Sequence, residues 1–360
     1  MQASPLLSKI KKSAIHINKY MKSFTRLLCL CYLGLVRRTW PEGFCLGFLI
    51  RVGDKARKIA RRKLTPDLGI NFINRSKAST QLVVVLVGYK PELWPLTLER
   101  IARFVPRDAD VCLATSGRRV AALDVIAQEQ GWSYLSTSLN EVSTVQNLAI
   151  EKHPAAQYIF KLDEDVFVGR GYFEMMLQGH LAVKQAGLHK PGISAPLINI
   201  NGYGYIEFLK EMGLSEDYRA RFGELQQSAD KIRAHYDGEA ALWLWERSLP
   251  FDEIVQRFAN VGFKYSTCPH RFSIGAILFE RSLWTAMGGL AVNDYPGGLG
   301  YDEEHLCKYC LNSSEVIVVL HNVFAGHFGF GPQNQIMLKA LNQLIPGLTI
   351  KPDINQAGQK

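Results

Sequence analysis

The chain has 360 residues, of which 47% are hydrophobic and 21% are charged, so the composition is that of a globular protein and excludes a disordered or collagen-like chain. Its formal net charge of +9 is unevenly distributed. Residues 1–78 carry 17 basic and 3 acidic side chains, whereas the remainder carries 25 basic and 30 acidic ones. The N-terminal segment should therefore be attracted to a polyanion, either an anionic membrane surface or nucleic acid.

The N-terminal segment contains a predicted amphipathic helix within residues 9–38. Apolar side chains recur at alternating spacings of four and three, at Ile10, Ala14, Ile17, Met21, Phe24, Leu28, Cys31 and Leu35. A second basic block follows at 51–64. We interpret residues 1–78 as a membrane-docking segment and linker, which predicts a peripheral protein on the cytoplasmic membrane face. The alternative is a helix packed on the protein's own core, and nucleic acid is disfavoured because no recognised binding motif is present.

No stretch of the sequence is long enough to be read as a membrane span. The longest apolar run, LLCLCYLGLV at 27–36, falls short of the roughly 20 residues that a spanning helix needs. The cysteines are odd in number and scattered, at positions 29, 31, 45, 112, 268, 307 and 310. They predict reduced thiols in a reducing compartment. A zinc site at Cys307 and Cys310 is disfavoured because there is no second pair with this spacing.

From residue 81 onward, predicted strands and helices alternate. Strands are predicted at 81–90, 108–117, 132–138 and 157–168, and helices at 95–105, 118–131 and 143–153. This alternation predicts an α/β fold with a mostly parallel central sheet and helices on both faces. The later part is predicted to be extended at 194–205, mostly helical at 206–260, strand and helix at 271–290, helical from 300–310, and a strand with a glycine-rich loop at 314–331.

Three consecutive acids end the fourth predicted strand, in the stretch YIFKLDEDVFV. In an extended chain Asp163 and Asp165 point to the same side, about 6–7 Å apart, and Glu164 points to the other. Ligands of α/β sheets bind at the carboxyl ends of the strands. The two aspartates therefore predict a site for Mg²⁺ or Mn²⁺. The alternative is a charged strand end in salt bridges with Lys161 or Arg170.

The alternating unit and the stretch VQNLAIEKHPAAQYIFKLDEDVFV resemble the N-terminal half of GT-A-fold, nucleotide-sugar-dependent glycosyltransferases, in particular the bacterial type of family 2. Asn147 matches the asparagine of the family's helix, and Asp163 and Asp165 match its two aspartates. RFSIGAILFERSLWTAMGGL and GYDEEHLCKY resemble its acceptor side. The resemblance covers residues 81–330 and is looser in the second half.

The resemblance implies a set of site residues. Asp163, Asp165 and His327 would hold the Mn²⁺ or Mg²⁺ ion, and Glu303, or else Asp302, would be the catalytic base. The residues expected to bind the donor nucleotide are Asp163, Val87, Gly88, Tyr89, Thr115, Arg118 and Asn147. Two alternatives stay open, namely that the acids at 302–304 only cap a helix and that His327 is a structural loop histidine. The nucleobase is also open, because the second strand ends in TSGRR where the family usually has an aspartate.

We therefore expect a GT-A-like catalytic domain at 79–335, with a nucleotide-binding half at 79–190 and an acceptor half at 191–335 that holds a helical insertion at 206–260; residues 336–360 form a tail. The expected reaction is metal-dependent, inverting transfer from a nucleoside-diphosphate sugar to a glycan or lipid-linked acceptor, in polysaccharide or glycolipid synthesis.

Two alternative functions stay open. A nucleotidyltransferase usually carries a glycine-rich basic loop after its first strand, and the stretch GYKPELWP at that place argues against this function. The non-enzymatic alternative is a membrane-associated scaffold with a degenerate site.

Overall fold

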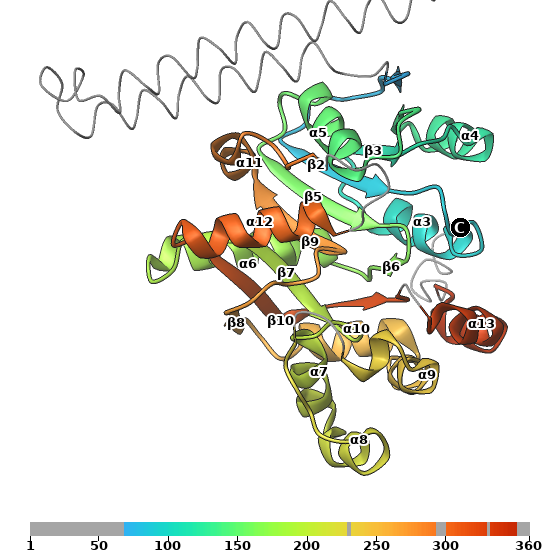
Figure 1. Cartoon of the computed structure of the whole chain (residues 1–360), viewed down its shortest axis with the longest axis vertical. Coiled ribbons are helices and arrows are strands. Elements are labelled where there is room, and N and C mark those ends of the chain that lie inside the picture. Colours follow the sequence, from blue (N-terminus) through green and yellow to red (C-terminus); the bar gives the residue numbers. More distant parts are fainter. Residues whose placement is uncertain (1–67, 229–231, 293–299, 330–331, 351–360) are drawn as a thin grey trace, which may run out of the picture. The chain divides into compact units, whose positions relative to one another are not determined.

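A ten-stranded sheet runs through the residues that the computed structural model describes, which are 68–228, 232–292, 300–329 and 332–350 (Figure 1). The strands are β1 (Asn71–Ile73), β2 (Gln81–Leu86), β3 (Asp110–Thr115), β4 (Ser133–Ser136), β5 (Tyr158–Asp163), β6 (Val166–Phe167), β7 (Pro191–Ile198), β8 (Tyr265–Cys268), β9 (Ala276–Glu280) and β10 (Val316–His327). The predicted membrane-docking helix and the second basic block lie outside the described residues. Within the described ranges no helix is long and apolar enough to cross a membrane.

The strand order is β1-β4-β3-β2-β5-β9-β7-β10-β6, and β8 pairs with β10. β2, β3, β4 and β5 are mutually parallel neighbours, as the alternating sequence predicts. β9 runs antiparallel to both β5 and β7, so the sheet is mixed where the sequence pattern had indicated mostly parallel strands. The predicted α/β class, a central sheet with helices on both faces, is confirmed.

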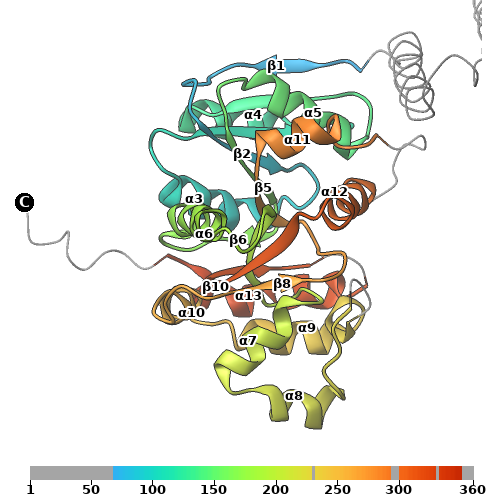
Figure 2. The same cartoon turned by 90° about the vertical axis from the view of Figure 1, so that its left-hand side faces the viewer.

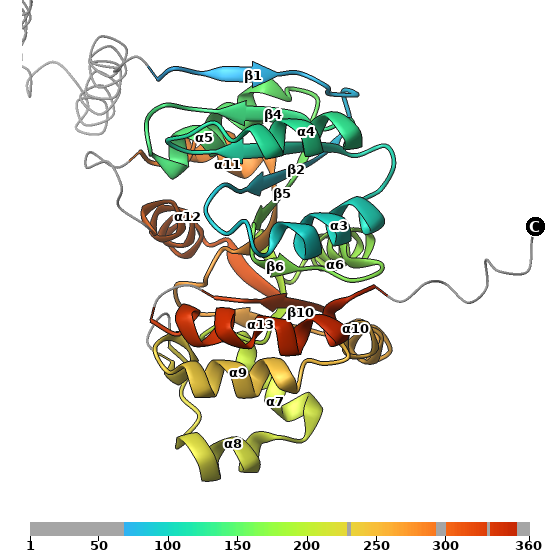
Figure 3. The ribbon, with the colours of Figure 1, turned by 90° about the vertical axis from the view of Figure 1, so that its right-hand side faces the viewer.

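Helices cover both faces of the sheet. They are α3 (Trp94–Phe104), α4 (Ala121–Gln130), α5 (Val142–Lys152), α6 (Tyr172–Ala186), α7 (Gly204–Met212), α8 (Ser215–Phe222), α9 (Gly238–Glu246), α10 (Phe251–Ala259), α11 (Arg281–Met287), α12 (Tyr301–Asn312) and α13 (Asn334–Leu348), with a 3-10 turn at Arg233–His235. Figures 2 and 3 show α3 and α6 on one side of the sheet and α12 on the other. The helices α7 to α10, which fill the predicted insertion, gather with α13 beyond β10.

The insertion is part of the hydrophobic core. On α10 the side chains of Phe251, Ile254, Val255 and Phe258 are buried, a spacing that places them on one helix face. Phe258 stacks on Phe324 of β10, with ring centroids 5.1 Å apart. The helical layer is therefore held to the sheet by aromatic packing.

Both ends of the folded unit differ from the predicted domain bounds. β1 pairs antiparallel with β4, so the sheet already includes residues that we had assigned to the linker. At the other end α13 starts before the predicted tail and buries Met337, Leu341 and Leu344. β1 has only three residues, and so short a segment is stabilised by its pairing with β4 and leaves no pattern of its own in the sequence.

The topological switch point of the sheet lies between β2 and β5. The chain leaves β2 toward β3 on one side, whereas β5 pairs with β2 on the other. Leu86 at the end of β2 is in register with Asp163 at the end of β5. Such a reversal of strand order is where ligands of open α/β sheets bind.

Candidate active site

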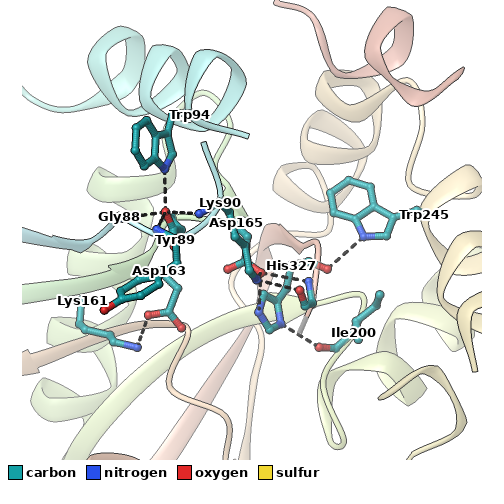
Figure 4. A network of polar contacts seen from close by, with 12 residues as sticks. Gly88, Tyr89, Lys90, Trp94, Lys161, Asp163, Asp165, Ile200, Trp245 and His327 are labelled. Carbon is teal, nitrogen blue, oxygen red and sulfur yellow. Dashed lines mark hydrogen bonds and ion pairs between the residues drawn. The ribbon is translucent and has the colours of Figure 1, made fainter. Parts of the chain in front are cut away.

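The three acids after β5 lie in a turn, and the extended geometry expected for them is wrong. β5 ends at Asp163, and Glu164 and Asp165 form a turn before β6. The chain has to turn because β5 pairs with β2 and β9, whereas β6 pairs with the end of β10. Each of the three acids consequently faces different partners (Figure 4).

Asp165 is buried among positive and hydrogen-bonding groups. Its Oδ2 accepts from Lys90 Nζ at 2.5 Å and from the backbone N–H of Gly329 at 3.2 Å, and it lies 3.4 Å from His327 Nε2. Burial alone would raise the pKa of this carboxyl group. The charges of His327 and Lys90 outweigh burial and hold the pKa of Asp165 well below its usual range. Asp165 is therefore an ionised carboxylate at every physiological pH.

The imidazole of His327 is oriented by groups behind it. Its Nδ1 lies 3.3 Å from the carbonyl oxygen of Ile200, and its backbone N–H donates to Asn199 Oδ1 at 2.9 Å. A carbonyl only accepts, so Nδ1 carries the proton and Nε2 is turned toward Asp165. Burial would lower the pKa of His327, but the Asp165 carboxylate outweighs burial and raises it.

Asp163 lies at the same strand end, beside a position that carries no side chain. Its Oδ1 accepts from Lys161 Nζ at 2.6 Å, and loss of hydration raises its pKa despite that lysine. A Cβ atom on Gly275 would lie 3.2 Å from Asp163 Oδ2 and 3.7 Å from His327 Nε2. A side chain at position 275 would therefore contact both the Asp163 carboxylate and the His327 imidazole.

Glu164 fastens the loop that follows β2. Its carboxylate accepts from the backbone N–H groups of Gly88, Tyr89 and Lys90 at 2.9–3.1 Å, and from Trp94 Nε1 at 2.6 Å. Gly88 has a φ of +135°, which side chains rarely adopt, so a glycine lets the loop present these N–H groups. The sequence pattern had placed Glu164 on the side away from the site. In the structure Glu164 accepts more hydrogen bonds than Asp163 or Asp165.

The donor set at this turn has the chemistry of a divalent-cation site. Asp163 and Asp165 offer hard carboxylate oxygens, and the proton on Nδ1 of His327 makes Nε2 the available ring nitrogen. In the part of the chain that the structure describes, however, no group of three or more His, Cys, Asp or Glu side chains is already arranged around a metal position. The residues fit a metal chemically, but Lys90 holds the carboxylate that such an ion would need.

A second cluster lies at the ends of β2 and β3. The Tyr89 ring is 50% exposed, its hydroxyl donates to the carbonyl of Ser116 at 2.5 Å, and Arg118 lies over the ring at 4.4 Å. Arg118 also donates to the carbonyl of Gly88 at 2.9 Å. This arrangement presents an aromatic face and an exposed guanidinium, which suit a base and a phosphate respectively.

Three of the predicted donor-binding residues make structural contacts. Asn147 donates to the carbonyl of Leu290 and accepts from Leu290 N–H and Trp284 Nε1, each at 2.8 Å. Its amide therefore holds α5 against the turn after α11. Thr115 is fully buried and donates to the carbonyl of Arg118, and Val87 is buried in the core. These contacts show that the residues shape the loops, and their assignment to the donor site stays a prediction.

The two candidate bases at the start of α12 have different surroundings. Asp302 is buried and accepts from Gln146 Nε2 at 2.8 Å, which ties α12 to α5. Glu303 accepts from Arg271 Nε at 2.5 Å and from the backbone N–H of Ile274 at 3.2 Å. Burial raises the pKa of Glu303 and outweighs Arg271. Lys161, the partner of Asp163, also acts on this pKa, so Glu303 lies within electrostatic range of the turn.

Sequence reasoning missed Lys90, Glu164 and Arg271 as residues of this site. Lys90 carried a usable signal, because it is the last residue of the strand predicted at 81–90 and so lies at the predicted ligand-binding edge. Glu164 contacts a segment that lies 70 or more residues away in sequence, and Arg271 contacts Glu303, 32 residues away. No local sequence pattern marks these contacts.

The cysteines of the described residues are buried free thiols. Burial raises the pKa of Cys307 and of Cys310 to about 12. Such thiols are predominantly protonated at neutral pH.

Comparison with known proteins finds similarity among solved structures but no match among family models or curated proteins. No protein-family model matches the chain, and no curated protein matches it. Among solved structures it is similar to GalNAc-T7 with UDP, GalNAc and Mn²⁺, at 13% identity and a TM-score of 0.43 over 74% of this chain and 48% of that one. The chain thus spans about half the length of that protein. The narrower assignment to the bacterial type of family 2 has no family match behind it and stays a prediction.

Proposed function

We propose that this protein is a glycosyltransferase that uses a nucleoside-diphosphate sugar. The observation that carries the proposal is the meeting of Asp163, Asp165 and His327 at the β2–β5 switch point, with Glu303 within electrostatic range. An ionised carboxylate with an oriented imidazole suits cation binding, and a carboxyl group of raised pKa suits proton transfer. In the transfer of a sugar from a diphosphate to a hydroxyl, a cation can stabilise the departing diphosphate and a base can take the proton of the hydroxyl.

The proposed roles follow from these surroundings. Tyr89 and Arg118 contact the nucleotide, and Asp163, Asp165 and His327 would hold Mn²⁺ or Mg²⁺. When bound, such an ion supplies charge stabilisation for the departing nucleoside diphosphate. Glu303 takes the proton from the acceptor hydroxyl as that oxygen attacks the anomeric carbon, which inverts its configuration in a single displacement.

The acceptor side of the proposal is less specific. The helical layer α7 to α10 lies beyond β10, whose end carries His327, and we propose that this layer shapes the acceptor site. The basic N-terminal segment supports a lipid- or polysaccharide-linked acceptor at a cytoplasmic membrane surface. Sedimentation of the full chain with anionic and with neutral vesicles tests this part separately: equal binding to both would contradict it.

A thermal-shift screen tests the proposed function. The full chain is heated with UDP, GDP, ADP or CDP, each in Mn²⁺ and in EDTA. A ligand that binds only the native state raises the melting temperature, so at least one nucleotide should do so in Mn²⁺. The matching nucleotide sugar should then be consumed when membrane lipid or glycan acceptor is added. The absence of any nucleotide-dependent shift, in Mn²⁺ and in EDTA alike, would contradict the proposal.

A further inference from the structure

Lys90 places a protein cation where the proposed site calls for a metal ion. Its ammonium group lies 2.5 Å from Asp165 Oδ2 and 2.8 Å from the carbonyl oxygen of Gly329 (Figure 4). The same Oδ2 also faces the Gly329 N–H and His327 Nε2. One carboxylate oxygen therefore accepts from two donors and lies beside an imidazole nitrogen, and an arriving divalent ion has to compete with the two donors.

The backbone and the side chain of Lys90 are held in different ways. Glu164 accepts the Lys90 N–H at 3.1 Å and the two preceding N–H groups, which fixes the loop. The lysine side chain is 19% exposed, whereas that of Asp165 is 3% exposed. A long, flexible side chain on a fixed backbone can change partner without moving the loop.

We propose that Lys90 is an exchangeable counter-ion: a divalent cation displaces its ammonium group from Asp165, and the released ammonium group then binds the diphosphate of the donor. The inference rests on the proposed function and deepens it. A dication would need Asp165 Oδ2 as a direct ligand, and Lys90 already occupies that oxygen at hydrogen-bond distance, so the dication and the ammonium group compete for it. Because Glu164 keeps the loop in place, the released lysine stays at the switch point, where a phosphate group would lie.

The site offers side chains that metals prefer, yet among the described residues no three of them are already arranged around a metal position. The proposed exchange explains this combination. With no ion present, the lysine neutralises Asp165 and spares it the cost of an unpaired buried charge. Displacement also frees the carbonyl of Gly329, at the end of the β10 segment. Binding of the cation should therefore precede tight binding of the diphosphate.

The first experiment measures Mn²⁺ binding to the full chain without nucleotide, by the electron paramagnetic resonance signal of free Mn²⁺. Lys90→Met removes the competitor and should tighten Mn²⁺ binding by about tenfold to a hundredfold, the usual worth of a charge-assisted hydrogen bond. Lys90→Arg keeps a competing cation and should resemble the wild type. Asp165→Asn should abolish binding in both backgrounds. Equal or weaker Mn²⁺ binding by Lys90→Met would overturn the proposal.

The second experiment follows the amine itself, through acetylation read by mass spectrometry. Lys90 should become more reactive when Mn²⁺ is added, and protected again when a nucleoside diphosphate joins the Mn²⁺. Lys152, exposed at the end of α5, is the matched control and should react equally in all three states. If saturating Mn²⁺ leaves the reactivity of Lys90 unchanged, the exchange does not occur.

The two proposals fail in distinguishable ways. If Mn²⁺ binds neither the wild type nor Lys90→Met, the exchange is refuted, yet donor turnover in EDTA would still support a metal-independent glycosyltransferase. If Mn²⁺ binds and displaces Lys90 but no nucleotide protects the amine or shifts the melting temperature, the second half of the exchange is refuted together with the glycosyltransferase proposal.

Discussion

Asp165 and Glu303 are two poorly exposed carboxyl groups of one candidate site, and their pKa values shift in opposite directions. Asp165 faces Lys90 and His327 and has its pKa lowered. Glu303 faces a single guanidinium, that of Arg271, whose side chain is 38% exposed, and has its pKa raised. Burial raises the pKa of both carboxyl groups. The direction of the net shift therefore depends on how many cations lie beside each carboxyl group and on how exposed those cations are to solvent.

This difference separates the two roles that the proposed reaction needs. A carboxyl group with a lowered pKa stays ionised and can hold a cation, whereas one with a raised pKa exchanges its proton closer to neutral pH. The pKa of Asp163 is raised, so as the pH falls Asp163 becomes protonated before Asp165 does. The following variants test whether the two carboxyl groups really differ in this way.

The largest effect is expected for Asp165→Asn. The change leaves the buried Lys90 ammonium group and His327 without their anion, and breaking a buried ion pair in this manner typically costs about 3–5 kcal/mol of unfolding free energy. Mn²⁺-dependent nucleotide binding and sugar transfer should both be lost. Urea unfolding and a transfer assay measure the two effects. Asp217→Asn, at an exposed position on α8, is the matched control. A variant that retains transfer would refute the assignment of Asp165.

A smaller but more selective effect is expected for Glu303→Gln. Loss of a general base typically lowers the rate by about 10²- to 10⁴-fold, and the donor site is left intact. The turnover number should therefore fall while the nucleotide-dependent thermal shift persists. Glu304→Gln changes the next, exposed residue of α12 and should leave turnover unchanged. Equal turnover of both variants would remove Glu303 from the mechanism.

The smallest effect is a difference in the pH dependence of stability. The lowered pKa of Asp165 gives a stabilisation that is present above its ordinary pKa of about 3.9 and is lost as the pH falls through the folded value. The raised pKa of Glu303 gives a stabilisation that is present below the ordinary glutamate pKa of about 4.3. This stabilisation is lost as the pH rises through the pKa of Glu303 in the folded protein. Relative to wild type, Asp165→Asn should therefore lose most stability at neutral pH, and Glu303→Gln should lose most in acid. Parallel pH profiles would mean that the two sites do not differ.

The secondary structure was predictable where a local pattern was long and regular. The apolar run of β2 and the helical spacing of α5 were found within a few residues of their bounds. β1 and the turn at Glu164 and Asp165 were not, because each depends on a strand that is distant in sequence. The place of Asp163 at the carboxyl end of a central strand was predictable for the same reason as the sheet, and its role in a ligand site stays a prediction.

By itself, then, the sequence determined an α/β sheet, a pair of aspartates at its carboxyl edge, and a basic N-terminal segment. Only the tertiary structure decided that Glu164 fastens the loop after β2, that Asn147 braces α11, and that Lys90 neutralises Asp165. The physical reason is range. Hydrophobic periodicity acts between near neighbours and is written along the chain, whereas hydrogen bonds and ion pairs act between whichever groups the completed fold brings within about 3 Å of each other.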